Sequence, residues 1–247
     1  MANGTKSGAE EAKTQAAITA VWEHGEDEQR RQDQSHWRGV GRWADDVKWR
    51  NLGRASLKRL KLCALALGRP LPTNPVVLEW GPGGGANLHA FRNLARVYVG
   101  IDISGKNLDE ARRMLAAEEP SSVTFAPVLL AGPPRSVVGQ FPPADIFLST
   151  ACFQHFPSKA YGAEVLRAIA ESCAPRAYGL IQIRYDNGDE AWRPVENLAR
   201  YEEMHIRATS YRLDEFWTLS QQAGFEPITI GHLNTSSNYA TFALQRV

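Results

Sequence analysis

The stretch LEWGPGGGANL, residues 78–88, places four glycines within residues 81–85, directly after the apolar run VVLEW of residues 76–80. The apolar run predicts a short buried strand, and residues 86 to about 94 predict a helix. A glycine-rich loop in that position can adopt positive φ angles and bring its backbone close to a ligand without an intervening Cβ. Unpaired amides at the start of the helix add hydrogen-bond donors. We therefore interpret these residues as a ligand-binding loop rather than a plain turn.

The pattern of this loop fits two kinds of ligand. Gly81, Gly83 and Ala86 satisfy the GxGxxG/A pattern of NAD- and FAD-binding loops. Glu79 with Gly81, Gly83 and Gly85 satisfies the E/D-x-G-x-G-x-G pattern of proteins that bind S-adenosylmethionine (SAM). A carboxylate two residues before the first glycine would repel a pyrophosphate, whereas it is compatible with the sulfonium and ammonium cations of SAM. Glu79 therefore favours SAM, and an NAD-dependent oxidoreductase remains an alternative.

The second predicted strand, residues 96–102, ends on an acidic residue. Asp102 lies 21 residues beyond Gly81, and its carboxylate at that strand end can accept hydrogen bonds from both ribose hydroxyls of a nucleoside. NAD and SAM sites share this feature, so Asp102 indicates a nucleoside without distinguishing the two. No GKS or GKT follows the glycines, which excludes a Walker-type phosphate loop.

Apolar runs and helical patterns alternate along the chain after residue 71. This alternation predicts crossover units and a parallel sheet with helices on both faces, in which ligands bind at the carboxyl ends of the strands. The remaining predicted strands are 123–130, 144–152 and 177–185, followed by an antiparallel pair near the C-terminus. The remaining predicted helices are 104–119 and 158–173, which Ser104 and Ser158 could cap, and 210–224, which ends on a glycine.

Three segments differ from this alternating core in residues 71–247. Residues 1–20 are small, polar and charged, which indicates a mobile or weakly helical N-terminus. Residues 21–70 predict a helical cap and include four of the seven tryptophans. Those side chains either anchor helices onto the body or belong to a lid over a small-molecule pocket. Residues 186–209 show no clean period, and we interpret them as an insertion on the substrate side.

Composition narrows the class of protein. The formal net charge is +1, so no strong overall field attracts nucleic acid or an acidic membrane. The three cysteines have no CxxC or zinc-like spacing, which indicates free thiols in a reducing compartment. The first residues lack the apolar core of a signal peptide, and no apolar run approaches the length of a membrane span. We expect a cytoplasmic protein with a small-molecule partner and no membrane or nucleic-acid partner.

VVLEWGPGGGANL followed by VYVGIDIS resembles the first two motifs of the class I SAM-dependent methyltransferases. The resemblance covers roughly residues 74–247. It implies a Rossmann-like three-layer α/β/α sandwich with a seven-stranded, mostly parallel sheet, an antiparallel last strand and, here, extra N-terminal helices. It also implies that SAM is the cofactor.

The resemblance implies roles for individual residues. The loop glycines would line the methionine end of SAM, Asp102 would hold the ribose, and Ile103 would contact the adenine. Thr150 or Ala151 would lie near the methyl donor. One departure is that LLAGPP, after the third strand, lacks the acidic residue that often binds the adenine amine in this family. The expected cofactor-binding residues are Glu79, Gly81, Gly83, Gly85, Asn87, Asp102, Ile103, Thr150 and Ala151.

Three residues outside the loop are candidates for catalysis. A hydroxyl acceptor must lose its proton, and His155, just beyond the fourth strand, can act as that base or can simply hydrogen-bond the loop. Asp186 follows the fifth strand, where it either closes a DNG turn or holds Mg²⁺, as in catechol-type O-methyltransferases. His205 would reach the substrate if the insertion covers the pocket. Cys152 is interpreted as a buried thiol rather than a nucleophile.

These observations predict a methyltransferase that acts on a hydroxyl of a polar small molecule, such as a sugar or a hydroxylated natural product. A small-molecule N-methyltransferase is the first alternative, because a neutral amine has its own lone pair. A non-catalytic SAM-binding protein is a more remote one. No DPPY or NPPY motif follows the fourth strand, which argues against methylation of a nucleic-acid amine. The tryptophan-rich segment could also support a homo-oligomer.

Overall fold

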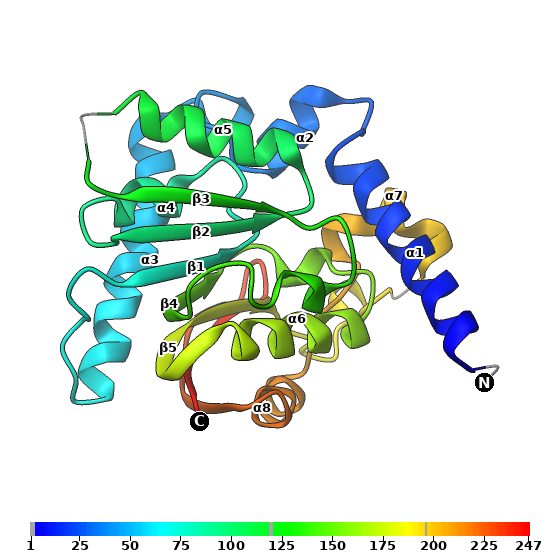
Figure 1. Ribbon diagram of the computed structural model, residues 1–247. Helices are drawn as coiled ribbons and strands as arrows, with labels where there is room; N and C mark the ends of the chain where they lie inside the picture. The colour runs from blue at the N-terminus through cyan, green and yellow to red at the C-terminus, as the bar shows by residue number, and fades with distance from the viewer. Residues whose placement is uncertain (1–2, 119–120, 196) are drawn as a thin grey trace.

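The computed structural model describes residues 3–118, 121–195 and 197–247, and their strands form one seven-stranded sheet (Figure 1). The sheet order is β3-β2-β1-β4-β5-β7-β6. β7 is antiparallel to both of its neighbours, and the other paired strands are parallel. The fold prediction is therefore confirmed. The strands are β1 (Val76–Trp80), β2 (Val97–Asp102), β3 (Thr124–Leu129), β4 (Ala144–Ser149), β5 (Cys173–Arg184), β6 (Phe225–Asn234) and β7 (Tyr239–Arg246).

Helices cover both faces of the sheet because their apolar sides have two separate cores to fill. On one face α3 (Asp46–Ala66), α4 (Ala86–Phe91) and α5 (Gly105–Ala116) pack over the central strands. On the other face α6 (Lys159–Glu171) and α8 (Leu213–Gln222) pack against the sheet. Figure 1 shows α5 above the sheet and α6 and α8 below it. These are the three layers that the alternating sequence predicts.

Local sequence signals set most element boundaries. The Ser104 hydroxyl accepts a hydrogen bond from the Asn107 amide at 3.2 Å and caps α5, and Ser158 caps α6 in the same way. The fifth strand begins at Cys173, four residues earlier than predicted, because Cys173 pairs with Ala144 of β4. A pairing partner far away in the sequence leaves no local signal for that extension.

The N-terminal helix and the insertion meet beyond the carboxyl ends of the strands. α1 (Asn3–Trp22) occupies most of the segment for which a mobile or weakly helical chain was expected, and residues 1–2 lie outside the described residues. Ile18 and Trp22 of α1 form a small apolar cluster with Tyr201 and Ala208 of the insertion. Figure 1 shows α1 beside α7 (Tyr201–Met204) at this end of the sheet. Single-turn helices fill the other connections: η1 (Gly41–Trp43), η2 (Pro134–Val137), η3 (Phe153–His155), η4 (Glu190–Trp192), η5 (Leu198–Arg200) and η6 (His205–Arg207).

Two of the four tryptophans of the N-terminal segment form hydrogen bonds to other parts of the chain, and two form them within the segment. The Trp22 indole N–H donates to the Tyr201 hydroxyl at 3.2 Å, and the Trp37 indole N–H donates to Asn107 Oδ1 at 2.9 Å. The indoles of Trp43 and Trp49 donate to backbone carbonyls within the same segment. A buried indole whose N–H is satisfied combines a large apolar contact with a directional bond. These contacts agree with the anchoring interpretation, and Trp22 and Trp43 also line a cavity, as the lid interpretation expects.

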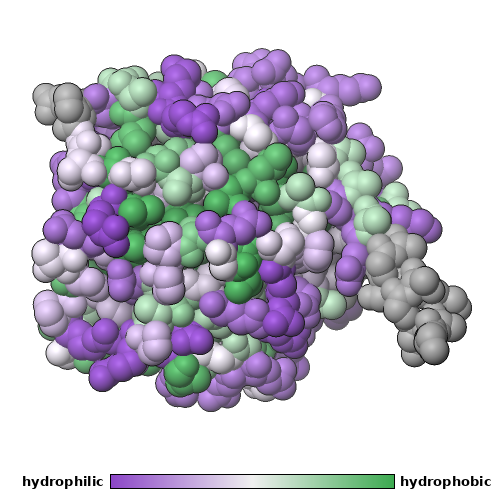
Figure 2. Space-filling model, viewed as in Figure 1, coloured by the Kyte–Doolittle hydropathy of each residue, from purple (hydrophilic) through white to green (hydrophobic). Residues whose placement is uncertain are grey.

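One edge of the sheet is open to solvent. β3 is an edge strand, and Leu129 at its end is 54% exposed. Figure 2 shows apolar side chains across the middle of this face, where Figure 1 places β3, with hydrophilic side chains above and below. Pro127 lies within this strand and has no backbone N–H to donate, and proline within a sheet is confined largely to edge strands. No described helix combines the length and apolar character needed to cross a bilayer.

Close contact between α3 and α4 gives a stability prediction. A Cβ on Gly53 of α3 would lie 2.1 Å from the Ala86 carbonyl oxygen and 2.7 Å from the Ala90 Cβ of α4. We expect Gly53→Ala to lower the free energy of unfolding by about 1–3 kcal/mol, because this overlap outweighs the better helix propensity of alanine. Urea unfolding measures the change. Arg54→Ala, at the exposed neighbouring position, should stay within about 0.5 kcal/mol, and a more stable Gly53→Ala would contradict the contact.

Candidate active site

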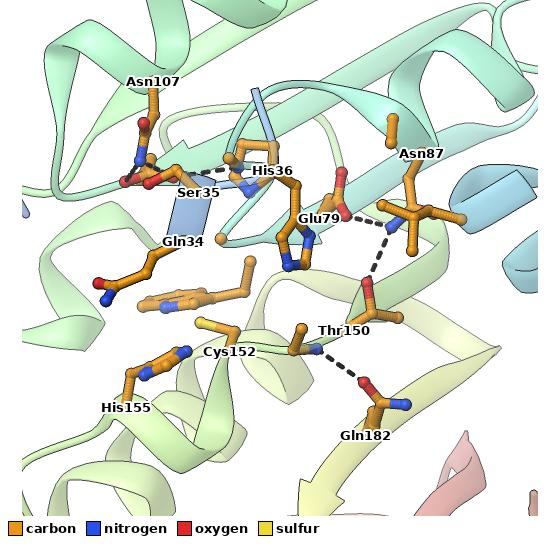
Figure 3. Close-up of a pocket in the computed structure, with 18 of the residues that line it drawn as sticks. Gln34, Ser35, His36, Glu79, Asn87, Asn107, Thr150, Cys152, His155 and Gln182 are labelled. Atoms are coloured by element: carbon orange, nitrogen blue, oxygen red, sulfur yellow. Dashed lines mark hydrogen bonds between the residues drawn. The ribbon is translucent and has the colours of Figure 1, made fainter. Parts of the chain in front are cut away.

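A cavity of about 440 Å³ opens at the carboxyl ends of the central strands. This is where strand order reverses between β1 and β4, the usual ligand position in open α/β sheets. All of the expected cofactor-binding residues except Gly85 line the cavity. Figure 3 shows side chains of the N-terminal segment, the glycine loop and the β4 end pointing into the same space.

Gly85 has a different role from the one expected. It is the N-cap of α4 with φ of 81°, and its amide donates to the Pro82 carbonyl at 3.0 Å. A Cβ there would lie 3.0 Å from the Ala111 Cα of α5. Gly85 therefore turns the loop into the helix and lets α5 approach, instead of lining the ligand space.

Two other glycines of the loop make room for the N-terminal segment. A Cβ on Gly83 would lie 2.4 Å from the Ser35 carbonyl oxygen, and one on Gly84 would lie 2.5 Å from that of His36. The Gly84 amide donates to the Ser35 carbonyl at 2.7 Å. The connection after α2 (Glu28–Gln34) is thus in direct backbone contact with the loop. The sequence pattern predicted close approach of a ligand at these glycines and gave no sign of this contact.

Glu79 supports the glycine loop through buried hydrogen bonds. Its carboxylate is 1% exposed and accepts hydrogen bonds from the Tyr98 hydroxyl at 2.6 Å and from Asn87 Nδ2 at 2.5 Å. Burial raises its pKa to about 7, although both hydrogen bonds favour the ionised form. Asn87 also donates to the Thr150 hydroxyl at 3.0 Å. The β1 end, α4 and the β4 end are therefore joined by one polar network.

Asp102 ends β2 and lines the cavity, where its carboxylate accepts hydrogen bonds from two backbone amides. Its Oδ1 accepts from the Ser104 amide at 2.9 Å and its Oδ2 from the Gly83 amide at 3.3 Å. Burial raises its pKa to about 6. Asn87 adds a second acceptor, because its Oδ1 is buried and has no hydrogen-bond partner among the described residues. A carboxylate and an orphaned amide oxygen fit the ribose hydroxyls and the ammonium group of SAM.

The end of β4 forms the floor of the cavity. Ala151 has a φ of 51°, and its amide donates to Gln182 Oε1 at 2.9 Å. Cys152 fills the space beside Gly81, where a Cβ would lie 2.6 Å from the Cys152 sulfur. Burial raises the pKa of the Cys152 thiol, so the thiolate needed for nucleophilic attack is disfavoured. Gln182 was missed in the sequence, where its only signal is a polar residue near the end of a buried strand.

His155 lines the cavity, but both of its ring nitrogens already have partners. Nδ1 donates to the His205 carbonyl at 2.9 Å, and Nε2 accepts from the Gln154 amide at 3.0 Å. Burial lowers its pKa to about 3, and Trp22 packs edge-on at 4.9 Å between ring centroids. This geometry matches the interpretation in which His155 hydrogen-bonds the surrounding loops, and it leaves no nitrogen ready to take a proton.

The two other catalytic candidates lie away from the cavity lining. His205 is bonded to the Glu202 carbonyl at 2.8 Å and to Gln34 Oε1 at 2.9 Å. Asp186 Oδ1 accepts from the Gly188 amide at 2.8 Å, which is the turn interpretation of DNG. Within residues 3–118, 121–195 and 197–247, no group of three or more His, Cys, Asp or Glu side chains could hold a metal. The Mg²⁺ expectation is therefore unsupported.

The sequence did not place His36 among the catalytic candidates, and the structure puts it in the lining of the cavity. Its φ of 60° is rare for a non-glycine residue and is a form of strain that often accompanies function. Its ring lies 4.5 Å from the Trp43 ring, and Figure 3 shows the imidazole directed into the cavity toward Thr150 and Cys152. Burial, and secondly the nearby Arg42 charge, lower its pKa to about 4, so the ring is neutral at pH 7.

α3 supplies the remaining wall of the cavity. The lining side chains include Lys48, Leu52, Ala55 and Arg59. Steps of four, three and four residues place them on one face of the helix. The cavity thus extends from the loop and Asp102 along a stripe whose two ends are basic and whose middle is apolar.

Comparison with known proteins agrees with this geometry. Residues 49–230 match the sequence model of a family described as methyltransferase domain. No curated protein matches the chain significantly. A putative methyltransferase from Bacillus halodurans superposes with a TM-score of 0.56 at 14% identity, over 74% of this chain and 97% of that one.

Two further solved structures share the fold. A SAM-dependent methyltransferase from Methanosarcina mazei has a TM-score of 0.57 at 14% identity, covering 72% of this chain and 94% of that one. SAM-bound CalS10, an amino pentose methyltransferase from Micromonospora echinaspora, has a TM-score of 0.54 at 14% identity, covering 81% and 92%. Because the family match spans most of the chain and the observed fold agrees with it, this protein belongs to the class I SAM-dependent methyltransferases.

Proposed function

We propose that the protein methylates a hydroxyl of a polar small molecule that binds in the same cavity as SAM. The observation that carries this proposal is the continuity of the cavity. One space contacts Asp102 and the glycine loop at one end and the α3 stripe at the other, with Thr150 and His36 between them. When bound, SAM supplies an electrophilic methyl group on a sulfonium. The protein's task is then to align donor and acceptor and to remove a proton.

The residues near Asp102 fit the donor. The Asp102 carboxylate would accept the ribose hydroxyls, and the unpaired Asn87 Oδ1 would accept from the ammonium group. Ile103 and Leu130 line the same end of the cavity and offer apolar contacts for the adenine ring. Leu130 follows the third strand in place of the acidic residue that the family often carries there.

His36 is the best-placed group to receive the proton of a hydroxyl acceptor. Its ring is neutral at pH 7, and no hydrogen bond engages its nitrogens among the described contacts. A base with a low pKa is weak, so it assists as the proton becomes acidic in the transition state rather than ionising the hydroxyl beforehand. The low basicity of His36 favours the alternative, an amine acceptor, because a neutral amine has its own lone pair and needs only to be oriented. CalS10, similar in fold, is described as acting on an amino pentose.

The general test is methyl transfer by the purified full-length protein. Labelled SAM would be offered with a panel of sugars, hydroxylated aromatics and their amine counterparts, and products would be identified by mass spectrometry. Methylated hydroxyl compounds support the proposal, and methylated amines alone would select the N-methyltransferase. Binding of S-adenosylhomocysteine without any methylated product would indicate a non-catalytic SAM-binding protein.

Asp102 gives the first prediction for this site. We expect Asp102→Asn to weaken binding of S-adenosylhomocysteine at pH 7.5 by about tenfold or more, through the loss of charge-assisted hydrogen bonds. Because burial holds the Asp102 pKa at about 6, wild-type affinity should fall as the pH falls through 6 and the carboxylate becomes protonated. Isothermal titration calorimetry at pH 5 and pH 7.5 measures both effects.

A control separates Asp102 from other charges. Asp109→Asn, at an exposed position on α5, should leave affinity and its pH dependence unchanged. A pH dependence that persists in Asp102→Asn would assign the titration to Glu79, whose pKa is raised to about 7. Wild-type affinity in Asp102→Asn would refute the assignment of Asp102 to the ribose.

His36 gives the second prediction. We expect His36→Asn to lower kcat for a hydroxyl acceptor by roughly a hundredfold, with affinity for S-adenosylhomocysteine unchanged, since asparagine tolerates the same left-handed backbone. His155→Gln should keep most of the activity and lose thermal stability, because it removes the bond to the His205 carbonyl. If His36→Asn instead kept its activity and His155→Gln lost it, His155 would be the base.

The pH profile gives the third prediction. A base with a pKa of about 4 is unprotonated across the neutral range, so kcat/KM for a hydroxyl acceptor, measured with SAM saturating at every pH, should be flat from pH 6 to 8. It should fall only as the pH drops through about 4, where protonation removes the ring lone pair. A midpoint near 6.5 would contradict this assignment, and a rate that rises toward the pKa of an amine substrate would indicate an amine acceptor.

A further inference from the structure

The far end of the cavity holds a cation that lacks an acidic partner. Arg59 lines the cavity from α3, and its Nε is buried without a hydrogen bond among the described residues. Earlier in the same helix Arg50 pairs with both Asp46 and Glu118, whereas no ion pair of Arg59 occurs within the described chain. Burying a guanidinium by half without a carboxylate partner costs free energy, and an anionic ligand that pairs with it would offset this cost.

The charges that surround Arg59 are also basic. His232 of β6 and Lys58 are near enough to interact, since the pKa of His232 is lowered by burial first and then by the positive charges of Arg59 and Lys58. The pKa of Arg59 is itself lowered by burial, with no carboxylate acting to raise it. Arg59, which lines the cavity, and the neighbouring Lys58 are the cations here, and their charge would attract an anion.

Uncharged donors lie on the same side of the sheet. Gln182 Oε1 is occupied by the Ala151 amide, so its Nε2 donors are available to a ligand in the cavity that it lines. Thr241 of β7 is directly opposite Gln182 in the strand register, and its hydroxyl is buried without a partner among the described residues. Directly opposed residues share a face of the sheet. Thr241 itself does not line the cavity, so the donors that face a ligand there are the Arg59 guanidinium and the Gln182 amide, which suit carboxylate or phosphate oxygens.

The α3 stripe also sets the shape of such a ligand. Arg59 lies eleven residues from Lys48, about 16 Å along the helix axis, so one small anion cannot contact both side chains. The Lys48 ammonium already lies over the Trp43 ring, 5.2 Å from its centroid. Leu52 and Ala55 line the wall between the two cations. The acceptor that fits has an apolar body along this wall and an acidic group at the Arg59 end.

We infer that the methyl acceptor carries an anionic group, a carboxylate or a phosphate ester, and that Arg59 with Gln182 binds that group. This inference rests on the methyl-transfer function proposed above, and it deepens it by naming the substrate class. Arg59 is a specificity-determining residue in this scheme, since it contacts the acidic group of the acceptor rather than the reacting atoms. Within the described part of the chain, no other arginine lines the cavity, so the guanidinium contact to the acid falls to Arg59.

The test uses simple probes on the full-length protein saturated with S-adenosylhomocysteine. Benzoate, phenyl phosphate and the neutral benzamide are titrated by calorimetry into wild type, Arg59→Gln and Arg54→Gln. Wild type should bind at least one acid about tenfold or more tighter than benzamide, Arg54→Gln should retain that preference, and Arg59→Gln should lose it. The stronger of the two acids identifies a carboxylate or a phosphate group.

The outcomes separate this inference from the function it rests on. Equal binding of acids and benzamide by wild type, no binding of any probe, or a preference that survives in Arg59→Gln would overturn the anionic acceptor. The preliminary titration of S-adenosylhomocysteine tests the methyltransferase site independently. If that ligand binds while the probes show no preference, the donor site stands and only the anionic acceptor fails.

Discussion

The contact between the glycine loop and the backbone of Ser35 and His36 governs the rest of the site. It needs two adjacent positions without side chains, because a Cβ on Gly83 or Gly84 would overlap the carbonyl oxygens of that segment. The hydrogen bond from Gly84 to Ser35 fixes its register at 2.7 Å. Once the segment is held there, the His36 ring enters the cavity and the Trp49 indole can bond the His36 carbonyl. The glycine loop, the N-terminal segment and the His36 side chain are therefore held together by the same contacts.

Burial disfavours the charged forms of the titratable side chains around the cavity. It raises the pKa of Glu79 and Asp102 and lowers that of His36 and His155, so each group is pushed toward its neutral form. The hydrogen bonds from Tyr98 and from the Gly83 amide counter this for the two acids. A cationic donor would favour the ionised carboxylates, which makes ligand binding and protonation mutually dependent.

The sequence predicted the core well because its signals there are local. Glycine spacing, apolar strands and the caps Ser104 and Ser158 depend on neighbouring residues, and Asp102 follows from its place at a strand end. The surroundings of the catalytic candidates could not be predicted in the same way, because they depend on partners that are distant in the sequence. His155 gave no hint that His205 and Gln154 would occupy its nitrogens, and Asp186 forms the ordinary turn that its sequence permits.

The family match covers only part of the wall that we assign to the acceptor, because His36 and Lys48 precede it and Arg59 and Gln182 lie inside it. The family match begins at residue 49, so α1, α2 and the connection bearing His36 precede it, while Asp102 and the glycine loop lie inside it. α3 spans the start of the match. Its residues Leu60 and Cys63 pack in the core between the helix and the sheet, and Lys48 and Arg59 line the cavity. The same helix therefore contributes both to the core and to the wall of the cavity. Cys63 lies one helical turn beyond Arg59, so the row of α3 that lines the cavity continues directly into the core.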